Sequence, residues 1–443
     1  MEIYLEPART LFCYFCLSTS KLISLQTVAA PSQQHIFRTV MHCICSRGNR
    51  LLQHQSVFKD ESKLDINYVP PSLPHREKER RLLSGFFEFL LQFPERMAQR
   101  VIIAGDVGTG KTALSKHFGT ELVLQGNKRG LKLRYIHVNC REYRGSLFLI
   151  LHKSVAFFRP NFPRRGYSAE ELLGTLMQCL DEEDAFVILA LDEFDSLIER
   201  EGSEAIYKLT RLQETRQDKP QRLSLVCILR DLSLLERLDV SARSTLQRNV
   251  VNLEKYGRDQ LVDILNDRVS MAFEANAVPE DSVLFIAELA QSESGNARFA
   301  IELLWRAGKY ADSEVADRVL PECIRLAFSS ILPSVKKSEL ASLGLHEQLL
   351  LLSAARVFKE SESAYTVLSE VEKGYAIACE EYGERPSSHT QVWKYAQFLS
   401  ALGFIKLEVI TVSTRGRTTQ VSLPSVASAE LEREILASLK KYR

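Results

Sequence analysis

Four short runs of hydrophobic residues recur in the first half of the chain, and polar residues barely interrupt them. They cover residues 101–104, 133–138, 186–191 and 223–229. Runs of this length without alternation are typical of strands buried on both faces of a parallel sheet. Because stretches with helical spacing lie between them, the pattern predicts an α/β layered domain.

The hydrophobic pattern changes twice further along the chain. From about residue 251 to 330 it is wholly helical, as at Leu261, Ile264 and Leu265, which predicts a small helical lid. A short linker at 333–338 follows. The last hundred residues then predict three helices and a two-stranded hairpin, which is the layout of a winged helix. These elements are expected at 346–358, at 370–382, after Ser387 and Ser388, at 404–412 and at 418–423.

The first 55 residues show neither helical nor strand periodicity, and Met41 offers an alternative start. We expect a poorly ordered extension or a misassigned start there. Glu2 and Glu6 argue against a targeting peptide, which needs a basic amino-terminal region. The predicted organisation is an extension over 1–55, an α/β core with a helical insertion over 56–250, a lid over 251–332 and a winged helix over 335–443.

Composition adds few constraints. The chain is 45% hydrophobic and 26% charged with a net charge of +1, as in ordinary globular proteins. This near-neutral charge argues against electrostatic binding of nucleic acid by the whole protein surface, but it allows a local basic patch that binds nucleic acid. No hydrophobic run is long enough to cross a bilayer, so no membrane partner is expected.

The nine cysteines are scattered along the chain. Five fall within apolar or helical stretches, which predicts buried free thiols in a reducing cytoplasm. Cys13-x-x-Cys16 and Cys43-x-Cys45 provide four thiolates, but the second spacing is too tight to favour a zinc site. The five expected thiols are Cys140, Cys179, Cys227, Cys323 and Cys379.

The strongest chemical signal is the segment Gly105–Thr112, which follows the run 101–104 directly and precedes a helical stretch. It has the Walker A spacing GxxxxGK[ST], whose glycines let backbone N–H groups turn inward around phosphate oxygens. Lys111 would reach the β- and γ-phosphates, and the Thr112 hydroxyl would ligate Mg²⁺. The nucleotide-lining residues predicted here are Val107, Gly108, Thr109, Gly110, Lys111 and Thr112.

The hydrophobic run 186–191 is followed directly by a pair of carboxylates, Asp192 and Glu193. The carboxyl ends of parallel strands meet at one edge of a sheet, where ligands of such folds bind. Asp192 would hold Mg²⁺ together with Thr112, and Glu193 would act as the general base toward the attacking water. The two segments together predict an ATP or ADP site with Mg²⁺.

Three segments resemble the archaeal Orc1/Cdc6 DNA replication initiators, which belong to the AAA+ class. They are Asp192–Asp195, Ser294–Leu304 and Tyr68–Glu77, and the resemblance runs from about residue 56 to the end. It implies a P-loop AAA+ core, a helical lid and a carboxyl-terminal winged helix. It also implies an ATP-binding protein of origin recognition, with double-stranded origin DNA and an MCM-type replicative helicase as partners. Other initiator copies on DNA are a further candidate partner, and the compartment is the cytoplasm, at the nucleoid.

The resemblance also assigns roles to lid residues. Arg298 matches the sensor-2 arginine, which touches the γ-phosphate and acts with Asp192 and Glu193 in catalysis. Tyr256 and Arg268 match lid positions that line the nucleotide. Without the family, Arg298 would pass for a surface arginine and the other two for packing residues.

Two positions depart from the family pattern. Arg230 follows the run 223–229, where relatives commonly carry a sensor-1 asparagine. An arginine can donate to a phosphate but cannot accept a hydrogen bond from water. Arg243 lies near, but offset from, the expected arginine finger. We therefore predict nucleotide binding with slow hydrolysis at most.

The predicted third helix of the winged helix has one apolar stripe and one polar face. Thr390 and Lys394 lie opposite Val392 and Leu399, free to face a DNA groove. Residues 385–420 hold five basic residues against one acid, a net charge of +4. Such a patch is alternatively a plain solvated face, and the resemblance to the initiator winged helix favours DNA. The predicted DNA-binding residues are Ser388, His389, Thr390, Lys394, Arg415 and Arg417, with Ser387 or Ser388 capping the helix and His389 facing DNA or the cap.

A second DNA contact is suggested at residues 162–166, within the helical insertion. Arg164 and Arg165 there are equally consistent with a simple surface loop.

The first hypothesis for the whole chain is an ATP-dependent initiator that binds origin DNA and helps recruit the helicase. The second is a non-hydrolysing, nucleotide-bound DNA-binding regulator, favoured by Arg230. A third is another AAA+ machine of the clamp-loader type, which would need an oligomerisation collar instead of a basic wing.

Overall fold

The computed structural model describes residues 56–214, 219–246, 249–331, 337–412, 416–424 and 426–440. The predicted extension over 1–55, with its two cysteine pairs, lies outside them. So does the main part of the predicted linker at 333–338.

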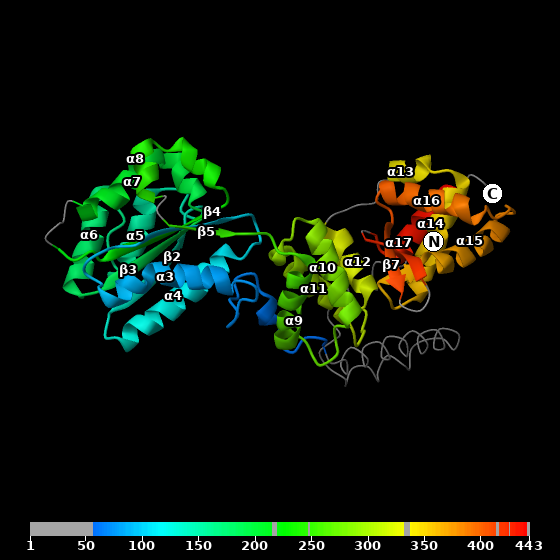
Figure 1. Cartoon of the computed structure of the whole chain (residues 1–443), viewed down its shortest axis with the longest axis horizontal. Coiled ribbons are helices and arrows are strands. Elements are labelled where there is room, and N and C mark those ends of the chain that lie inside the picture. The colour runs from blue at the N-terminus through cyan, green and yellow to red at the C-terminus, as the bar shows by residue number, and fades with distance from the viewer. Residues whose placement is uncertain are drawn as a thin grey trace, which may run out of the picture. The chain divides into compact units, whose positions relative to one another are not determined.

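The core is a five-stranded parallel sheet with the strand order β2-β3-β4-β1-β5 (Figure 1). Each of the four strands expected from the hydrophobic runs is present, and β3 and β4 are buried along their whole length. The order places β4 between β3 and β1, so the ends of all three meet at one edge. The strands are β1 Arg100–Gly105, β2 Leu133–Asn139, β3 Phe186–Asp192, β4 Leu223–Leu229 and β5 Val250–Leu253.

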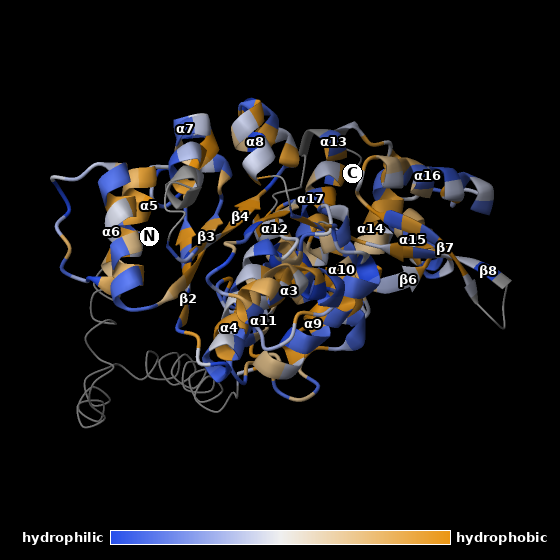
Figure 2. Ribbon diagram, turned by 60° about the vertical axis from the view of Figure 1, so that its left-hand side comes forward, coloured by the Kyte–Doolittle hydropathy of each residue, from blue (hydrophilic) through white to orange (hydrophobic). Residues whose placement is uncertain are grey.

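Helices cover both faces of this sheet. Alternate residues of β1 point to opposite sides: Val101 and Ile103 pack toward α3 and α4, while Ile102 and Ala104 pack toward α5, α6, α7 and α8. In Figure 2 the strands are coloured as hydrophobic and the covering helices carry hydrophilic outer faces. The helices are α3 Glu77–Gln92, α4 Lys111–Lys128, α5 Leu147–Phe158, α6 Ala169–Glu182, α7 Asp195–Glu214 and α8 Val240–Leu246, with a 3-10 turn η4 at Leu232–Arg237.

One sequence expectation was wrong at the border between sheet and lid. The pattern after residue 251 was expected to be wholly helical, yet Val250–Leu253 forms β5 and pairs with β1. A four-residue strand is too short to establish a period of its own. The predicted limit between core and lid, at 250/251, therefore falls inside a strand.

The helical region after β5 has its own hydrophobic core. The segment that follows residue 56 packs here, since the Phe58 and Phe273 rings lie 4.7 Å apart and the Lys59 amide donates to the Ala272 carbonyl. The sequence had grouped this segment with the sheet. The elements are η3 Glu61–Leu64, α9 Arg258–Ala272, α10 Glu280–Ser292, α11 Ala297–Ser313 and α12 Pro321–Ile331.

The carboxyl-terminal region contains the three predicted helices and the predicted hairpin around a third hydrophobic core. Three elements were not expected from the pattern: the short helix α13, the strand β6, which completes a three-stranded sheet of order β6-β8-β7, and the terminal helix α17. The elements are α13 Lys337–Ser342, α14 Leu345–Glu360, β6 Tyr365–Val367, α15 Leu368–Glu381, α16 His389–Ala401, β7 Lys406–Val412, β8 Gly416–Ser422 and α17 Ser428–Leu439.

Two composition-based expectations concern the described residues. No helix among them is long and apolar enough to cross a membrane. The five cysteines predicted as free thiols are all buried, and the structure joins none of them in a disulfide.

Candidate nucleotide site and DNA interface

The phosphate loop connects β1 to α4 and holds its shape by internal hydrogen bonds. Lys111 Nζ donates to the carbonyls of Gly105 and Asp106 at 2.6 and 2.7 Å. Gly110 caps α4 with φ of +88°, a backbone conformation that favours glycine. Burial lowers the pKa of Lys111, and the nearby Asp192 and Asp195 oppose that shift. The lysine is thus positioned above a cradle of backbone groups, as phosphate binding requires.

Thr112 and Asp192 meet as the two predicted magnesium ligands. The Thr112 hydroxyl donates to Asp192 Oδ2 at 2.7 Å, and His137 Nε2 lies 3.3 Å from the same oxygen. Burial raises the pKa of Asp192, but the His137 ring and the Thr112 hydroxyl lower it further, and the balance lies below the ordinary value. Asp192 is therefore a carboxylate at neutral pH.

This pair suits Mg²⁺ rather than an all-protein metal centre. Within the described residues no group of three or more His, Cys, Asp and Glu could hold a metal ion. Mg²⁺ commonly takes one or two protein oxygens and completes its octahedron with water and phosphate oxygens. A hydroxyl and a carboxylate at 2.7 Å supply that partial set beside the phosphate loop.

Glu193 stands beside this pair in a strained backbone conformation. Its φ is +48°, which is uncommon outside glycine, and its amide donates to Asp192 Oδ1 at 2.9 Å. Arg230, at the end of β4, brings Nη2 to 3.5 Å from Glu193 Oε1. The predicted base thus has a basic partner at the sensor-1 position.

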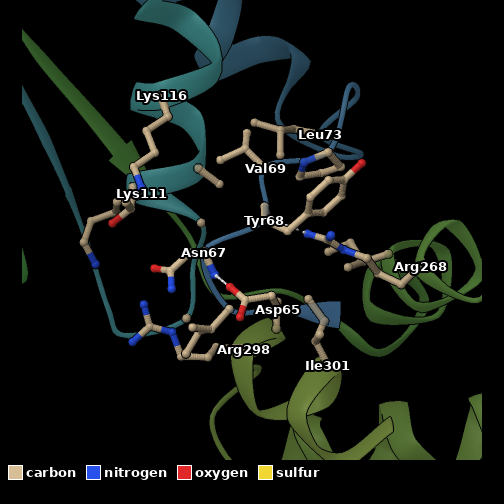
Figure 3. A pocket seen from close by; sticks show the side chains of 18 of the residues that line it. Asp65, Asn67, Tyr68, Val69, Leu73, Lys111, Lys116, Arg268, Arg298 and Ile301 are labelled. Atoms are coloured by element: carbon tan, nitrogen blue, oxygen red, sulfur yellow. Dashed lines mark hydrogen bonds between the residues drawn. The ribbon is translucent and has the colours of Figure 1, made fainter. Parts of the chain in front are cut away.

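One pocket of about 730 Å³ collects these groups. Phosphate-loop residues, the carboxylates at the end of β3, the segment before α3 and the first turn of α11 line it (Figure 3). Of the predicted nucleotide-site residues, Thr109 does not line it, because its side chain is buried and its hydroxyl donates to the Asp106 carbonyl. Those that line it are Val107, Gly108, Gly110, Lys111, Thr112, Asp192, Glu193, Tyr256, Arg268 and Arg298.

Arg268 builds the wall of the pocket away from the phosphate loop. Its guanidinium donates to the carbonyls of Lys63 and Tyr68 at 2.7 and 3.3 Å and lies 5.1 Å from the Tyr68 ring centre. Burial lowers the pKa of Arg268. Figure 3 shows Arg268 reaching toward Tyr68 beside Val69 and Leu73, an aromatic and aliphatic surface that suits a nucleobase.

Tyr256 is held in place by Arg76, whose role the sequence did not reveal. Arg76 is 4% exposed, donates from Nε to the Tyr256 hydroxyl at 2.9 Å and from Nη2 to the Glu254 carbonyl at 2.6 Å. Its guanidinium also lies 4.0 Å from the Tyr256 ring centre. A Cβ at Gly110 would stand 3.0 Å from the Tyr256 hydroxyl. Arg76 therefore fixes a side chain that closely approaches the phosphate loop.

The lid touches the phosphate loop through the first turn of α11. The Ala297 amide donates to the Gly108 carbonyl at 3.2 Å. A Cβ at Gly108 would stand 1.8 Å from Asn296 Oδ1, so only glycine allows this approach. Arg298, one residue further on, is exposed and faces the pocket (Figure 3), with no ion pair to any residue that the structure describes. Its guanidinium is available to a phosphate.

Sequence reasoning missed His137 and Asn296 as parts of this site. His137 interrupts the apolar run 133–138, and a polar residue among the apolar residues of a predicted strand is itself a signal. Asn296 lies in the quoted segment Ser294–Leu304 but was not given a role. Its side chain accepts from the Phe299 amide and so caps α11.

The winged helix exposes the predicted polar face of α16. Thr390 and Lys394 are exposed, whereas Val392 and Leu399 are buried, as the hydrophobic stripe predicted. Ser388 precedes the first turn at the N-cap position, but its hydroxyl makes no capping hydrogen bond among the described residues. The structure therefore confirms Ser388 as the N-cap residue, without a hydrogen bond from its side chain to the helix.

The remaining predicted DNA contacts are distributed unevenly. His389 Nδ1 lies 2.6 Å from Glu372 Oε1, so this ring has a carboxylate partner within the protein. Arg417 is exposed on β8, and Arg415 lies outside the described residues. At the insertion tip Arg164 and Arg165 are exposed, and the neighbouring Phe162 and Tyr167 rings lie with their centres 4.8 Å apart, tilted by 40°. These side chains form a second surface with basic and aromatic groups.

Known proteins share this arrangement. A family model of the Cdc6 AAA+ ATPase-type lid domain matches residues 262–329, and one of the CDC6 carboxyl-terminal winged helix domain matches 338–432. An AAA domain model matches 96–238. These matches and the sheet topology confirm the predicted fold class, an AAA+ core with a helical lid and a carboxyl-terminal winged helix.

Individual relatives agree. An ORC1-type DNA replication protein 2 from Sulfolobus acidocaldarius is 34% identical over 88% of this chain and 96% of its own length. The crystal structure of Cdc6p from Pyrobaculum aerophilum aligns with a TM-score of 0.75 at 29% identity, over 87% of this chain and 99% of that chain. The Aeropyrum pernix ORC1 protein, solved in complex with DNA, aligns with a TM-score of 0.58 at 27% identity, over 87% and 97%. The chain therefore belongs to the Orc1/Cdc6 family of DNA replication proteins, which are AAA+ ATPases with a Cdc6-type lid and a winged helix.

Proposed function

We propose that this chain is an ATP-dependent DNA replication initiator that binds double-stranded origin DNA and helps recruit an MCM-type replicative helicase in the cytoplasm, at the nucleoid. The observation that carries the proposal is the single pocket that unites Lys111, Thr112, the Asp192–Glu193 pair and Arg298. The same chain carries a winged helix with exposed basic residues. We also propose a core from residue 56, a lid to 332 and a winged helix over 335–443, with the limit between core and lid placed after Leu253, at the end of β5, instead of at 250/251.

Each residue of the nucleotide pocket would have a separate role toward ATP. Phosphate oxygens would accept from the loop amides and from Lys111, and Mg²⁺, held by Thr112 and Asp192, would offset their negative charge. Arg298 would contact the γ-phosphate, so that the lid senses whether ATP or ADP is bound. Glu193 would accept the proton of the attacking water. The Tyr68–Arg268 wall would hold the base.

DNA would be bound mainly by α16 and the wing. Thr390 and Lys394 would face a groove, while Arg417 and the neighbouring Arg415 would contact backbone phosphates or the minor groove. Ser388 and His389, at the start of the same helix, would also contact DNA, and the His389 ring is at the same time hydrogen-bonded to the Glu372 carboxylate. The basic and aromatic insertion tip would provide a second contact.

The nucleotide and the DNA would be coupled through the lid. The first turn of α11 contacts Gly108 in the phosphate loop. The exchange of ATP for ADP at this loop would therefore change how the lid packs against the core. Such a change shifts the population of the DNA-binding state. Additional copies on the same DNA, and the helicase, would recognise that state.

A second candidate function is a non-hydrolysing regulator that keeps its nucleotide, and the Arg230–Glu193 contact favours it. The clamp-loader alternative required an oligomerisation collar at the carboxyl end, where the chain has a winged helix. It is not proposed.

Nucleotide retention tests the site. Lys111→Ala should abolish the binding of ATP in a filter assay, because the loop loses its only side-chain cation aimed at the phosphates. Lys128→Ala, at the exposed end of the same helix, is the matched control and should bind as the wild type does. Unchanged ATP binding by Lys111→Ala would refute the assignment of the cradle.

A further inference from the structure

Arg230 occupies a position from which its side chain reaches the predicted general base, Glu193. It follows β4, the strand between β3 and β1, and its amide donates to Asp195 Oδ1 at 3.2 Å. The Phe194 amide donates back to the Ile228 carbonyl at 2.9 Å. These two bonds join the end of β4 to Phe194 and Asp195, the two residues that follow Glu193.

The side chain of Arg230 then reaches Glu193. Nη2 lies 3.5 Å from Glu193 Oε1, and the two side chains are 48% and 30% exposed. Glu193 itself is fixed by its φ of +48° and by the bond from its amide to Asp192 Oδ1. Asp192 therefore holds the backbone of Glu193, and Arg230 pairs with its carboxylate.

This contact opposes the role proposed for Glu193. In hydrolysis the water oxygen bonds to the γ-phosphorus, the bond from that phosphorus to the β-phosphate oxygen breaks with its electron pair leaving on ADP, and the water proton passes to Glu193. A general base must present a free lone pair to the water. A guanidinium has donors only, so at this distance it competes with the water for a lone pair of the Glu193 carboxylate and cannot itself accept from the water.

We infer that Arg230 is a brake on ATP hydrolysis: a positioning residue that holds the Glu193 carboxylate away from the attacking water and keeps the protein in its ATP-bound state. The inference rests on the proposed function, since it presupposes ATP in this pocket. It explains how a complete phosphate loop and acid pair can lie beside a sensor-1 position that cannot accept a hydrogen bond from the attacking water. With this brake, the ATP-bound form of the initiator on DNA has a longer lifetime than it would have without the Arg230 contact.

Removal of the brake should raise the rate. Arg230→Ala should increase kcat at saturating ATP by about two- to fivefold, the range that an exposed ion pair of this kind supports. Arg237→Ala, in the turn η4, removes an exposed arginine close by and is the matched control. Single-turnover hydrolysis separates this effect from any change in affinity for ATP, which is measured independently by filter retention. Thermal unfolding should be unchanged, since Arg230 is half exposed.

A second variant identifies the mechanism. In a Glu193→Gln background, Arg230→Ala should cause no increase, because the brake acts only through the carboxylate. A faster rate in that background, or an unchanged or lower kcat of Arg230→Ala in the wild-type background, overturns the inference. If the wild type shows no turnover, measurable turnover by Arg230→Ala supports the brake and its absence contradicts it. The two proposals fail separately. If Arg230 is not a brake, the wild type still retains ATP and Lys111→Ala still loses it. If the proposed function is wrong, the wild type does not retain ATP, or Lys111→Ala retains it equally well.

Discussion

Replacement of Arg76 by methionine tests whether the wall of the nucleotide pocket depends on one buried cation. The variant loses the hydrogen bonds to the Tyr256 hydroxyl and the Glu254 carbonyl, at 2.9 and 2.6 Å. Hydrogen bonds from a charged group contribute about 1.5–3 kcal/mol each. The stacking of the guanidinium on the Tyr256 ring contributes about 0.5–2 kcal/mol more.

Part of this loss is recovered, because methionine fills much of the same volume and no charge has to be buried. We therefore expect Arg76→Met to reduce the local stability around β5 and Tyr256 by about 2–4 kcal/mol. Native-state amide hydrogen exchange over Val250–Leu253 and the following loop is the appropriate assay, since global unfolding of a multidomain chain has no single free energy. The amides there should exchange roughly 30- to 1000-fold faster, at about 1.4 kcal/mol for each factor of ten.

Arg80, one turn further along α3, provides the control. It pairs with Glu121 at 3.0 Å and is 36% exposed, so Arg80→Met should cost about 0.2–1 kcal/mol and change exchange by at most about fivefold. If Arg76→Met also stays within fivefold, the argument that Arg76 holds Tyr256 against the phosphate loop is refuted.

Two further predictions concern the winged helix and the sheet. Lys394→Ala combined with Arg417→Ala should lower the slope of log affinity for DNA against log salt by about 2, because each removed cation, in the groove or at the backbone, neutralises phosphate charge that contributes about 0.9 to the slope. The exposed Lys373→Ala should leave the slope unchanged, and an unchanged slope in the double variant would exclude this face as the DNA contact. Burial raises the pKa of the Cys227 thiol to about 12, so the thiol stays neutral at pH 8. Iodoacetamide at pH 8 should therefore spare Cys227 in the folded protein and modify it on unfolding; modification at the rate of a free thiol would contradict its burial.

The sequence predicted those parts of the site that local patterns specify. The strands β1 and β3 appear in the sequence as uninterrupted apolar runs, and their parallel orientation then brings the residues that follow them to one edge of the sheet. The bond between Thr112 and Asp192 follows directly from that geometry. The polar face of α16 follows in the same way from helical spacing.

The parts that were missed depend on contacts between distant segments. Arg76 and Tyr256 are 180 residues apart, and neither neighbourhood carries a sign of the other. The His389–Glu372 contact joins two helices whose relative placement no periodicity predicts. β5 is defined by its pairing with β1 rather than by its own four residues. Such features arise from packing, which a single sequence does not record.

The central claim is that nucleotide at the phosphate loop controls the binding of DNA. The most direct measurement is the Kd of the full chain for genomic DNA fragments that it protects in footprinting, in saturating ATP and in saturating ADP. Allosteric coupling of ordinary size predicts Kd values that differ by at least about fivefold, and Lys111→Ala should abolish the difference while still binding DNA. Equal Kd values in ATP and ADP for the wild type would contradict the account.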